Sequence, residues 1–154
     1  MAAKALGDMI RATPTYKTLT PSTYTTKQNG TQFMKHKMAL ELQRLCETEM
    51  PPEEYPRYDT SMEASGATGE DALFGDVSGG GDPVALVGSS FSAEEEFNFD
   101  GFLSEYTGLP IANHAISGGL LFNAIISYTS SPQFEKERPP FVIWEAPAIY
   151  NLNE

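Results

Sequence analysis

Cysteine, histidine and tryptophan are scarce in this chain of 154 residues, which contains one, two and one of them respectively. With a single cysteine, Cys46, the chain forms no internal disulfide, so this residue is either a buried thiol or half of a bridge to a cysteine outside these residues. One cysteine and two distant histidines do not supply the usual ligands of a zinc site. We therefore expect neither a metal nor another cofactor.

Basic residues and long apolar runs are also lacking. The chain has ten lysines and arginines and 21 acidic residues, and the resulting net charge of -11 argues against nucleic acid or an anionic membrane surface as a partner. No apolar run approaches the roughly 18 residues that a membrane-spanning helix needs. The first residues contain no continuous apolar stretch, so they do not form a secretory signal peptide as they stand.

The remaining composition predicts one domain over residues 1–154 with three parts. Residues 1–46 form a helical N-terminal part, in which apolar residues recur at helical spacing over residues 2–11 and 31–46. Residues 47–82 are rich in proline, glycine and acids and form a long surface loop, with residues 72–76 tucked against the core. Residues 83–150 form the core.

Strand and helix patterns alternate within residues 83–150. Short apolar runs predict strands at residues 84–87, 109–116 and 141–145, and helical spacing predicts helices at residues 97–107 and 118–128. Gly108 is a natural C-terminal stop for the first of these helices. Two crossover helices imply parallel strands with right-handed connections. The predicted fold class is therefore α/β, an open parallel sheet with flanking helices.

Polar residues follow each predicted strand, where sites form in open parallel sheets. Ser89, Ser90 and Ser92 follow the first strand, and Glu145 follows the third. A serine at a tight strand-to-helix turn exposes its hydroxyl near backbone amides that suit an oxyanion. The tetrapeptide GSSF also fits an ordinary polar turn, and both interpretations remain open at this point.

A nucleophilic serine needs a base, which is usually a histidine oriented by a carboxylate. His36 is expected on the solvated face of its helix, and His114 is flanked by apolar residues and is expected in the core or at a strand end. No Asp-x-His pair occurs in the chain. The residues alone therefore indicate a nucleophile without its partner.

Four blocks in order, LFGDVSGGGDPVALVGSSFS, FNFDGFLSEYTG, NHAISGG and SPQFEKERPPFVIWEAPAIY, resemble the SGNH-hydrolase-like domain of alginate O-acetyltransferases of the AlgX and AlgJ type. The resemblance is clear over residues 70–150 and fainter upstream. It implies an α/β fold related to serine esterases, a periplasmic location, and a serine that passes an acetyl group from a donor to hydroxyls of alginate. It also implies contact with other exopolysaccharide assembly proteins.

The resemblance also assigns site residues. The family's Gly-Thr-Ser turn matches residues 88–90, so Ser90 takes the nucleophile's role. The amides of Ser90 and Gly118 are the implied oxyanion donors, with Asn113 a weaker one. Tyr150 matches a tyrosine of the family's substrate-binding groove.

One departure from the family concerns the base. The family's Asp-x-His pair precedes a helix that resembles residues 2–11, so we expect a partial domain whose first strands and base lie upstream. The resemblance likewise implies that Cys46 bridges to an upstream cysteine. Two alternatives remain: a catalytically inactive polysaccharide-binding or scaffold module of an exopolysaccharide assembly complex, and a plain esterase in which water replaces the sugar.

Overall fold

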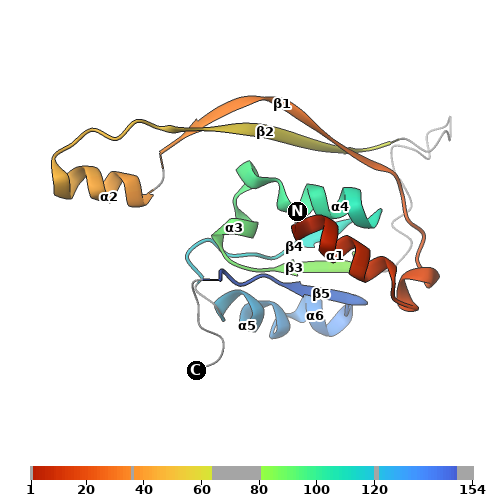
Figure 1. Cartoon of the computed structure of the whole chain (residues 1–154). Coiled ribbons are helices and arrows are strands. Elements are labelled where there is room, and N and C mark those ends of the chain that lie inside the picture. The colour runs from red at the N-terminus through yellow and green to blue at the C-terminus, as the bar shows by residue number, and fades with distance from the viewer. Residues whose placement is uncertain (1, 36, 64–80, 120–121, 149–154) are drawn as a thin grey trace, which may run out of the picture.

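A computed structural model describes residues 2–35, 37–63, 81–119 and 122–148 of the chain. It contains a three-stranded parallel sheet between helices and a separate two-stranded antiparallel ribbon (Figure 1). The described elements, with 3-10 helices labelled η, are α1 (Ala2–Arg11), η1 (Thr15–Thr18), β1 (Tyr24–Met34), α2 (Lys37–Cys46), β2 (Glu53–Met62), β3 (Val84–Val87), α3 (Ser90–Ala93), η3 (Glu95–Phe97), α4 (Phe99–Thr107), β4 (Ile111–Asn113), α5 (Asn123–Thr129), α6 (Pro132–Lys136) and β5 (Phe141–Trp144).

The sheet has the order β4-β3-β5, and both pairings are parallel. This confirms the predicted α/β class. The central strand β3 is buried at every position, and successive side chains of a strand point to opposite faces. Val84 and Leu86 pack toward α1 and α4, whereas Ala85 and Val87 pack toward α5. The continuous apolar run VALV is therefore explained by two covered faces.

Helices α1 and α4 cover one face of the sheet, and α5 and α6 cover the other (Figure 1). Helix α1 buries Ala3, Gly7 and Ile10, which are spaced so that they lie on one side of the helix. Helix α4 ends at Thr107 and is capped by Gly108, whose φ of 72° is left-handed and whose N–H donates to Ser104 O at 2.8 Å. The predicted helix at residues 2–11 and the predicted stop at Gly108 are both confirmed.

The first half of the chain differs from the prediction. Residues 1–46 are not all helical, because β1 occupies Tyr24–Met34 and α2 begins only at Lys37. Residues 47–82 are not all loop, because β2 pairs with β1 from Glu53 to Met62. The ribbon is solvated along most of both faces, so it lacks the apolar alternation by which a strand is predicted from sequence. The segment at residues 72–76 lies outside the described residues.

Within the core, the differences are in element bounds. The predicted strand at residues 109–116 is regular only at Ile111–Asn113, and the predicted helix at residues 118–128 is described as α5 from Asn123 to Thr129. The segment opened by Pro132 is a short helix, α6, with Pro132 in its first turn. Pro is accepted there because the first helical N–H groups have no partner within the helix. The third strand ends one residue early, at Trp144.

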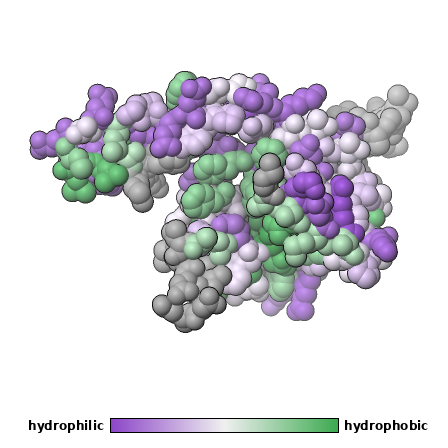
Figure 2. All heavy atoms as spheres, in the orientation of Figure 1, coloured by the Kyte–Doolittle hydropathy of each residue, from purple (hydrophilic) through white to green (hydrophobic). Residues whose placement is uncertain are grey.

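The ribbon lies over α4 and carries α2 at its far end (Figure 1). The ring of Tyr58 on β2 meets Phe102 on α4 edge to face at 5.1 Å between centroids. Asn98, which precedes α4, donates from Nδ2 to Thr60 Oγ1 at 2.9 Å. Most of the other side chains of the ribbon are exposed, and Figure 2 shows hydrophobic residues gathered over α2, where Leu40, Leu42 and Leu45 are exposed.

Candidate functional site at the carboxyl end of the sheet

Strand β3 ends in a sharp strand-to-helix turn. After Val87 and Gly88, Ser89 is extended and acts as the N-cap of α3, with its Oγ accepting from Phe91 N–H at 3.3 Å. Serine is favoured at this position because its short side chain satisfies a free amide of the first helical turn. Ser90 is consequently the first residue of α3. Its side chain is half-buried, and it makes no hydrogen bond to the residues that the structure describes.

The backbone amides of this turn are nearly all occupied. Ser92 and Ala93 donate to Ser89 O, at 3.1 and 3.0 Å, and Glu94 donates to Ser90 O at 3.0 Å. The Ser89 N–H donates to a side chain from another strand. Among the described residues, the Ser90 N–H has no acceptor. The amide and the hydroxyl of Ser90 are thus both without a protein hydrogen-bond partner in the described part of the chain.

The side chain that accepts from Ser89 is Glu145, at the end of β5. Its Oε2 accepts from Ser89 N–H at 2.8 Å, from Ser89 Oγ at 2.8 Å and from Ser92 Oγ at 3.1 Å. The Glu145 N–H also donates to Val87 O at 2.8 Å, which continues the β3–β5 pairing by one residue. Glu145 therefore joins the ends of two strands.

Gly88 makes room for this contact. A Cβ built on Gly88 would lie 2.6 Å from Glu145 Oε2, 2.9 Å from Glu145 Cβ and 3.1 Å from Ser92 Oγ. The first two distances are shorter than carbon and oxygen atoms tolerate without moving. The glycine of the GSSF motif is thus required by the close approach of Glu145, in addition to the turn.

The segment after β4 lies beside the same turn. His114 N–H donates to Leu86 O at 2.7 Å and Ile116 N–H donates to Gly88 O at 3.0 Å, so the segment runs along the end of β3. Asn113 Nδ2 donates to Ser92 O at 2.7 Å, and its Oδ1 accepts from Ala115 N–H at 3.1 Å. Asn113 therefore tethers β4 to α3.

Gly118 lies in the turn that follows. Gly119 N–H donates to Ile116 O at 3.1 Å, and Gly118 within this turn has a left-handed φ of 76°. Gly118 is exposed, and a Cβ built on it would meet nothing within 4 Å. Its N–H has no acceptor among the described residues. The structure thus places Gly118 two residues from the hydrogen bond that ties this segment to Gly88.

His114 lies on the other side of the sheet from Asn113. Its ring stacks on Tyr128 of α5 at 4.3 Å between centroids, next to a cavity of about 340 Å³. Burial lowers the pKa of His114, against a smaller opposing effect of Asp82, so the ring is favoured as the neutral form. It makes no hydrogen bond to Ser90, which agrees with the expectation of a packed histidine. His36 and Tyr150 lie outside the described residues.

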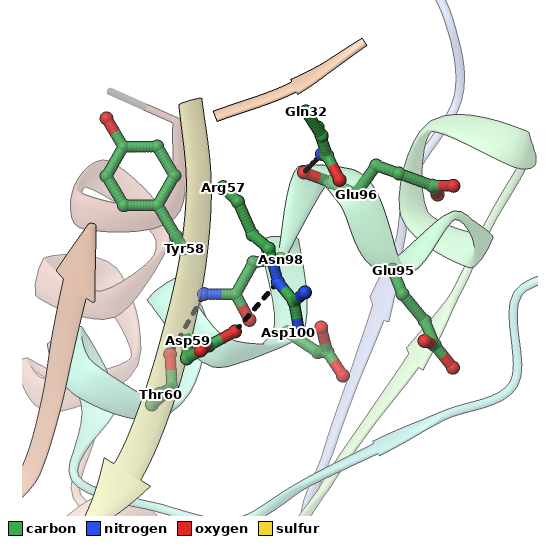
Figure 3. A pocket seen from close by; sticks show the side chains of 9 residues that line it. All are labelled: Gln32, Arg57, Tyr58, Asp59, Thr60, Glu95, Glu96, Asn98 and Asp100. Atoms are coloured by element: carbon green, nitrogen blue, oxygen red, sulfur yellow. Dashed lines mark hydrogen bonds and ion pairs between the residues drawn. The ribbon is translucent and has the colours of Figure 1, made fainter. Parts of the chain in front are cut away.

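A larger cavity, about 550 Å³, separates β2 from η3 and the start of α4 (Figure 3). Its lining residues are mostly polar, and four of the nine are acidic: Gln32, Arg57, Tyr58, Asp59, Thr60, Glu95, Glu96, Asn98 and Asp100. The one basic group among them, Arg57, is already paired with Asp59 at 3.4 Å. Sequence analysis missed this cavity because β2, which forms one wall, was not predicted. Its carboxylates disfavour an anionic ligand.

Two classes of site find no support in the described residues. They contain no group of three or more histidine, cysteine, aspartate or glutamate side chains placed to hold a metal ion. Within the same ranges, no helix is long and apolar enough to cross a membrane. Cys46 is exposed, which contradicts the first of its two predicted alternatives, a buried thiol, and leaves the second, a bridge to another cysteine, as a prediction.

Comparison with curated proteins finds relatives that are named for alginate biosynthesis. The chain is 32% identical over 153 residues to the alginate biosynthesis protein AlgX of Pseudomonas putida, covering 99% of this chain and 31% of the relative. It is 34% identical over 152 residues to the probable alginate O-acetylase AlgJ of Pseudomonas fluorescens, covering 97% of this chain and 37% of the relative. The chain thus spans about a third of the length of these relatives.

Solved structures give the same fold. A structure titled "Structural and functional characterization of Pseudomonas aeruginosa AlgX" matches with a TM-score of 0.79 at 24% identity, covering 99% of this chain and 33% of that one. The "O-Acetyltransferase Domain of Pseudomonas putida AlgJ" matches with a TM-score of 0.75, also at 24% identity, covering 95% of this chain and 47% of that one. The family model described as "SGNH hydrolase-like domain, acetyltransferase AlgX" matches residues 1–148. Because this match covers nearly the whole chain, the protein belongs to the family of AlgX-type SGNH hydrolase-like domains.

Proposed function

We propose that this domain carries out serine-based O-acetyl transfer to hydroxyl groups of an alginate-like polysaccharide, with Ser90 as the nucleophile. The observation that carries the proposal is the contrast between neighbouring serines. The hydroxyls of Ser89 and Ser92 both donate to Glu145, whereas the hydroxyl and amide of Ser90 are unbonded among the described residues. The family membership and the names of the relatives support the same chemistry.

In the first step, Ser90 Oγ attacks the carbonyl carbon of the acetyl donor and its proton passes to a general base. The carbonyl oxygen becomes an oxyanion that accepts hydrogen bonds from the amides of Ser90 and Gly118. The bond to the donor's leaving group then breaks, and the leaving group takes the proton. The product is an acetyl ester on Ser90.

In the second step, the base takes the proton of a sugar hydroxyl as that oxygen attacks the acetyl-serine. The Ser90 Oγ–carbon bond breaks, Ser90 regains a proton, and the sugar carries the acetyl group. Asn113 is a weaker oxyanion donor, because one of its amide protons already binds Ser92 O. By the family resemblance, Tyr150 contacts the acceptor.

The base is the part of this mechanism that the described residues do not contain. The ring of His114 is stacked on Tyr128 and makes no hydrogen bond to Ser90. By the family resemblance the base is an Asp-x-His pair, and no such pair occurs in these 154 residues. General-base assistance typically contributes about 10²- to 10⁴-fold, so the 154-residue chain should turn over slowly by itself.

The test uses p-nitrophenyl acetate with the chain and with the longest protein that its gene encodes. We expect the wild type to turn over the substrate and to yield a peptide that is acetylated at Ser90. We expect neither result for Ser90→Ala. Ser130→Ala is the control, because it removes an exposed serine hydroxyl at the C-terminal end of α5 that belongs to neither the turn nor its contacts. Equal turnover by wild type and Ser90→Ala would refute the assignment.

The same chemistry sets the location and partners that we propose. An enzyme of exopolysaccharide acetylation would work in the periplasm with other assembly proteins, and cell fractionation tests this. The acceptor is anionic and the protein carries a net charge of -11, so binding must use local contacts rather than overall attraction. Acetylated mannuronate oligomers, measured by mass spectrometry, distinguish acetyl transfer from hydrolysis to acetate.

One observation favours a second function, a polysaccharide-binding or scaffold module without chemistry. No histidine in the described part of the chain makes a hydrogen bond to the Ser90 side chain. Exposed Lys136 and Arg138 would then supply local positive charge. Saturable binding of mannuronate oligomers that Ser90→Ala leaves unchanged, together with no acetyl transfer by the full gene product, would support this function over the first.

A further inference from the structure

We infer that Glu145 is a positioning residue that holds the Ser89–Ser90 turn in its reactive form, an inference that rests on the proposed role of Ser90. Its carboxylate contacts neither the Ser90 hydroxyl nor the Ser90 amide. It acts on the residues on either side of Ser90. Three donors converge on one atom, Glu145 Oε2, from two positions of the turn.

A carboxylate suits this place because all its hydrogen-bonding atoms accept. Ser89 contributes its amide and its hydroxyl, and Ser92 contributes its hydroxyl. Hydrogen bonds to an ionised acceptor are shorter and roughly twice as strong as neutral ones. Ser89 and Ser92 are both buried, so water does not readily replace the carboxylate if it is removed.

The network also determines which amide remains available. Because Ser89 N–H is directed to Glu145, it is not a donor for the oxyanion. Because Ser89 Oγ donates to Glu145, its lone pairs face Phe91 N–H, which is occupied in turn. Within residues 89–93, Ser90 N–H is left as the amide without a protein acceptor in the described ranges. Glu145 thus leaves the Ser90 amide as the oxyanion donor, although it makes no hydrogen bond to that amide.

Gly88 supports the same inference independently. It lies against Glu145 so closely that a single added carbon would meet Oε2 at 2.6 Å. Gly88→Ala therefore displaces the carboxylate while leaving every functional group of the network in the chain. If Glu145 positions the turn, Gly88→Ala and loss of the carboxylate should have the same effect.

The test compares Glu145→Gln, Glu145→Met and Gly88→Ala in the longest protein that the gene encodes, with p-nitrophenyl acetate as substrate. Glutamine keeps an acceptor oxygen, so kcat should fall by no more than about tenfold, since charge-assisted bonds are only roughly twice as strong. Methionine keeps the volume without an adequate acceptor. We expect kcat to fall by about 10²-fold with KM nearly unchanged, as for a misplaced reacting group. Gly88→Ala should resemble Glu145→Met.

The double variant Glu145→Met with Gly88→Ala should be no slower than the slower single variant, because both remove the same interaction. Thr107→Val is the control for general destabilisation. Thr107 is fully buried at the end of α4 and makes no contact with the network, so its replacement should lower stability and leave kcat unchanged.

A second measurement does not depend on activity. The Ser89 amide should be protected from hydrogen exchange in wild type and Glu145→Gln, and should exchange faster in Glu145→Met and Gly88→Ala but not in Thr107→Val. If Glu145→Met has the same kcat and the same Ser89 amide exchange rate as the wild type, the inference is overturned, even if Ser90→Ala is inactive. Turnover by Ser90→Ala would instead refute the proposed function, which separates the two failures.

Discussion

Replacing Gly7 by alanine tests how α1 packs on the sheet. Gly7 is buried in the middle of α1, and a Cβ there would lie 2.7 Å from Tyr106 Cβ and 3.0 Å from the Tyr106 carbonyl carbon and oxygen. Two effects oppose each other. Alanine is better than glycine within a helix by about 1 kcal/mol. Overpacking against a neighbour that includes backbone atoms costs about 1–3 kcal/mol.

The steric effect should be larger, because two of the three close atoms belong to the α4 main chain and cannot rotate away. Moving α1 outward would also expose Ala3 and Ile10, which belong to the core clusters under β3. After the propensity gain of about 1 kcal/mol is subtracted from a steric cost at the upper part of the range of about 1–3 kcal/mol, we expect a net loss of about 1–2 kcal/mol. For a domain of this size, 1 kcal/mol corresponds to about 2–4 °C in Tm.

Unfolding by guanidinium, followed by the fluorescence of the single tryptophan, Trp144, measures the free energy of unfolding. Ala5→Gly is the matched control, because Ala5 is exposed on the same helix and reports propensity without packing. It should destabilise by about 1 kcal/mol. If Gly7→Ala stabilises the protein by as much as Ala5→Gly destabilises it, the backbone of α1 at Gly7 does not lie this close to Tyr106 of α4.

Three further predictions concern single side chains. Thr107→Val should cost about 1–3 kcal/mol in urea unfolding, because the buried Leu109 N–H loses the Thr107 Oγ1 acceptor at 3.1 Å; an unchanged stability would contradict this. Burial lowers the pKa of His114 below 6.5, so the unfolded chain binds its proton more tightly and the fold loses stability as pH falls through that value. His114→Phe should therefore reduce the difference in unfolding free energy between about pH 8 and about pH 5. An unchanged pH dependence of the unfolding free energy would argue against the stacked, desolvated ring. Cys46 is exposed, so in the reduced 154-residue chain it should react with Ellman's reagent as fast in the native state as in denaturant, whereas slow native labelling would show that it is covered.

The sequence by itself determined the core of this protein. The run VALV predicted β3, because a strand with two covered faces must be apolar at every position. Helix α1 was predicted by its spacing, and the end of α4 by Gly108, because both are local properties of the chain. The turn at Ser90 followed from the same logic, since it lies directly after the predicted strand.

Only the tertiary structure decided the remaining features, because they depend on residues far apart in the chain. The β1–β2 ribbon pairs Tyr24 with Met62 and is solvated along most of both faces, so no local pattern marks either strand. Glu145 meets Ser89 across 56 positions, and nothing in GSSF or FVIWE predicts that three donors share one oxygen atom. These contacts form because the sheet brings the ends of β3 and β5 side by side, and pairing, unlike periodicity, is a property of the folded chain.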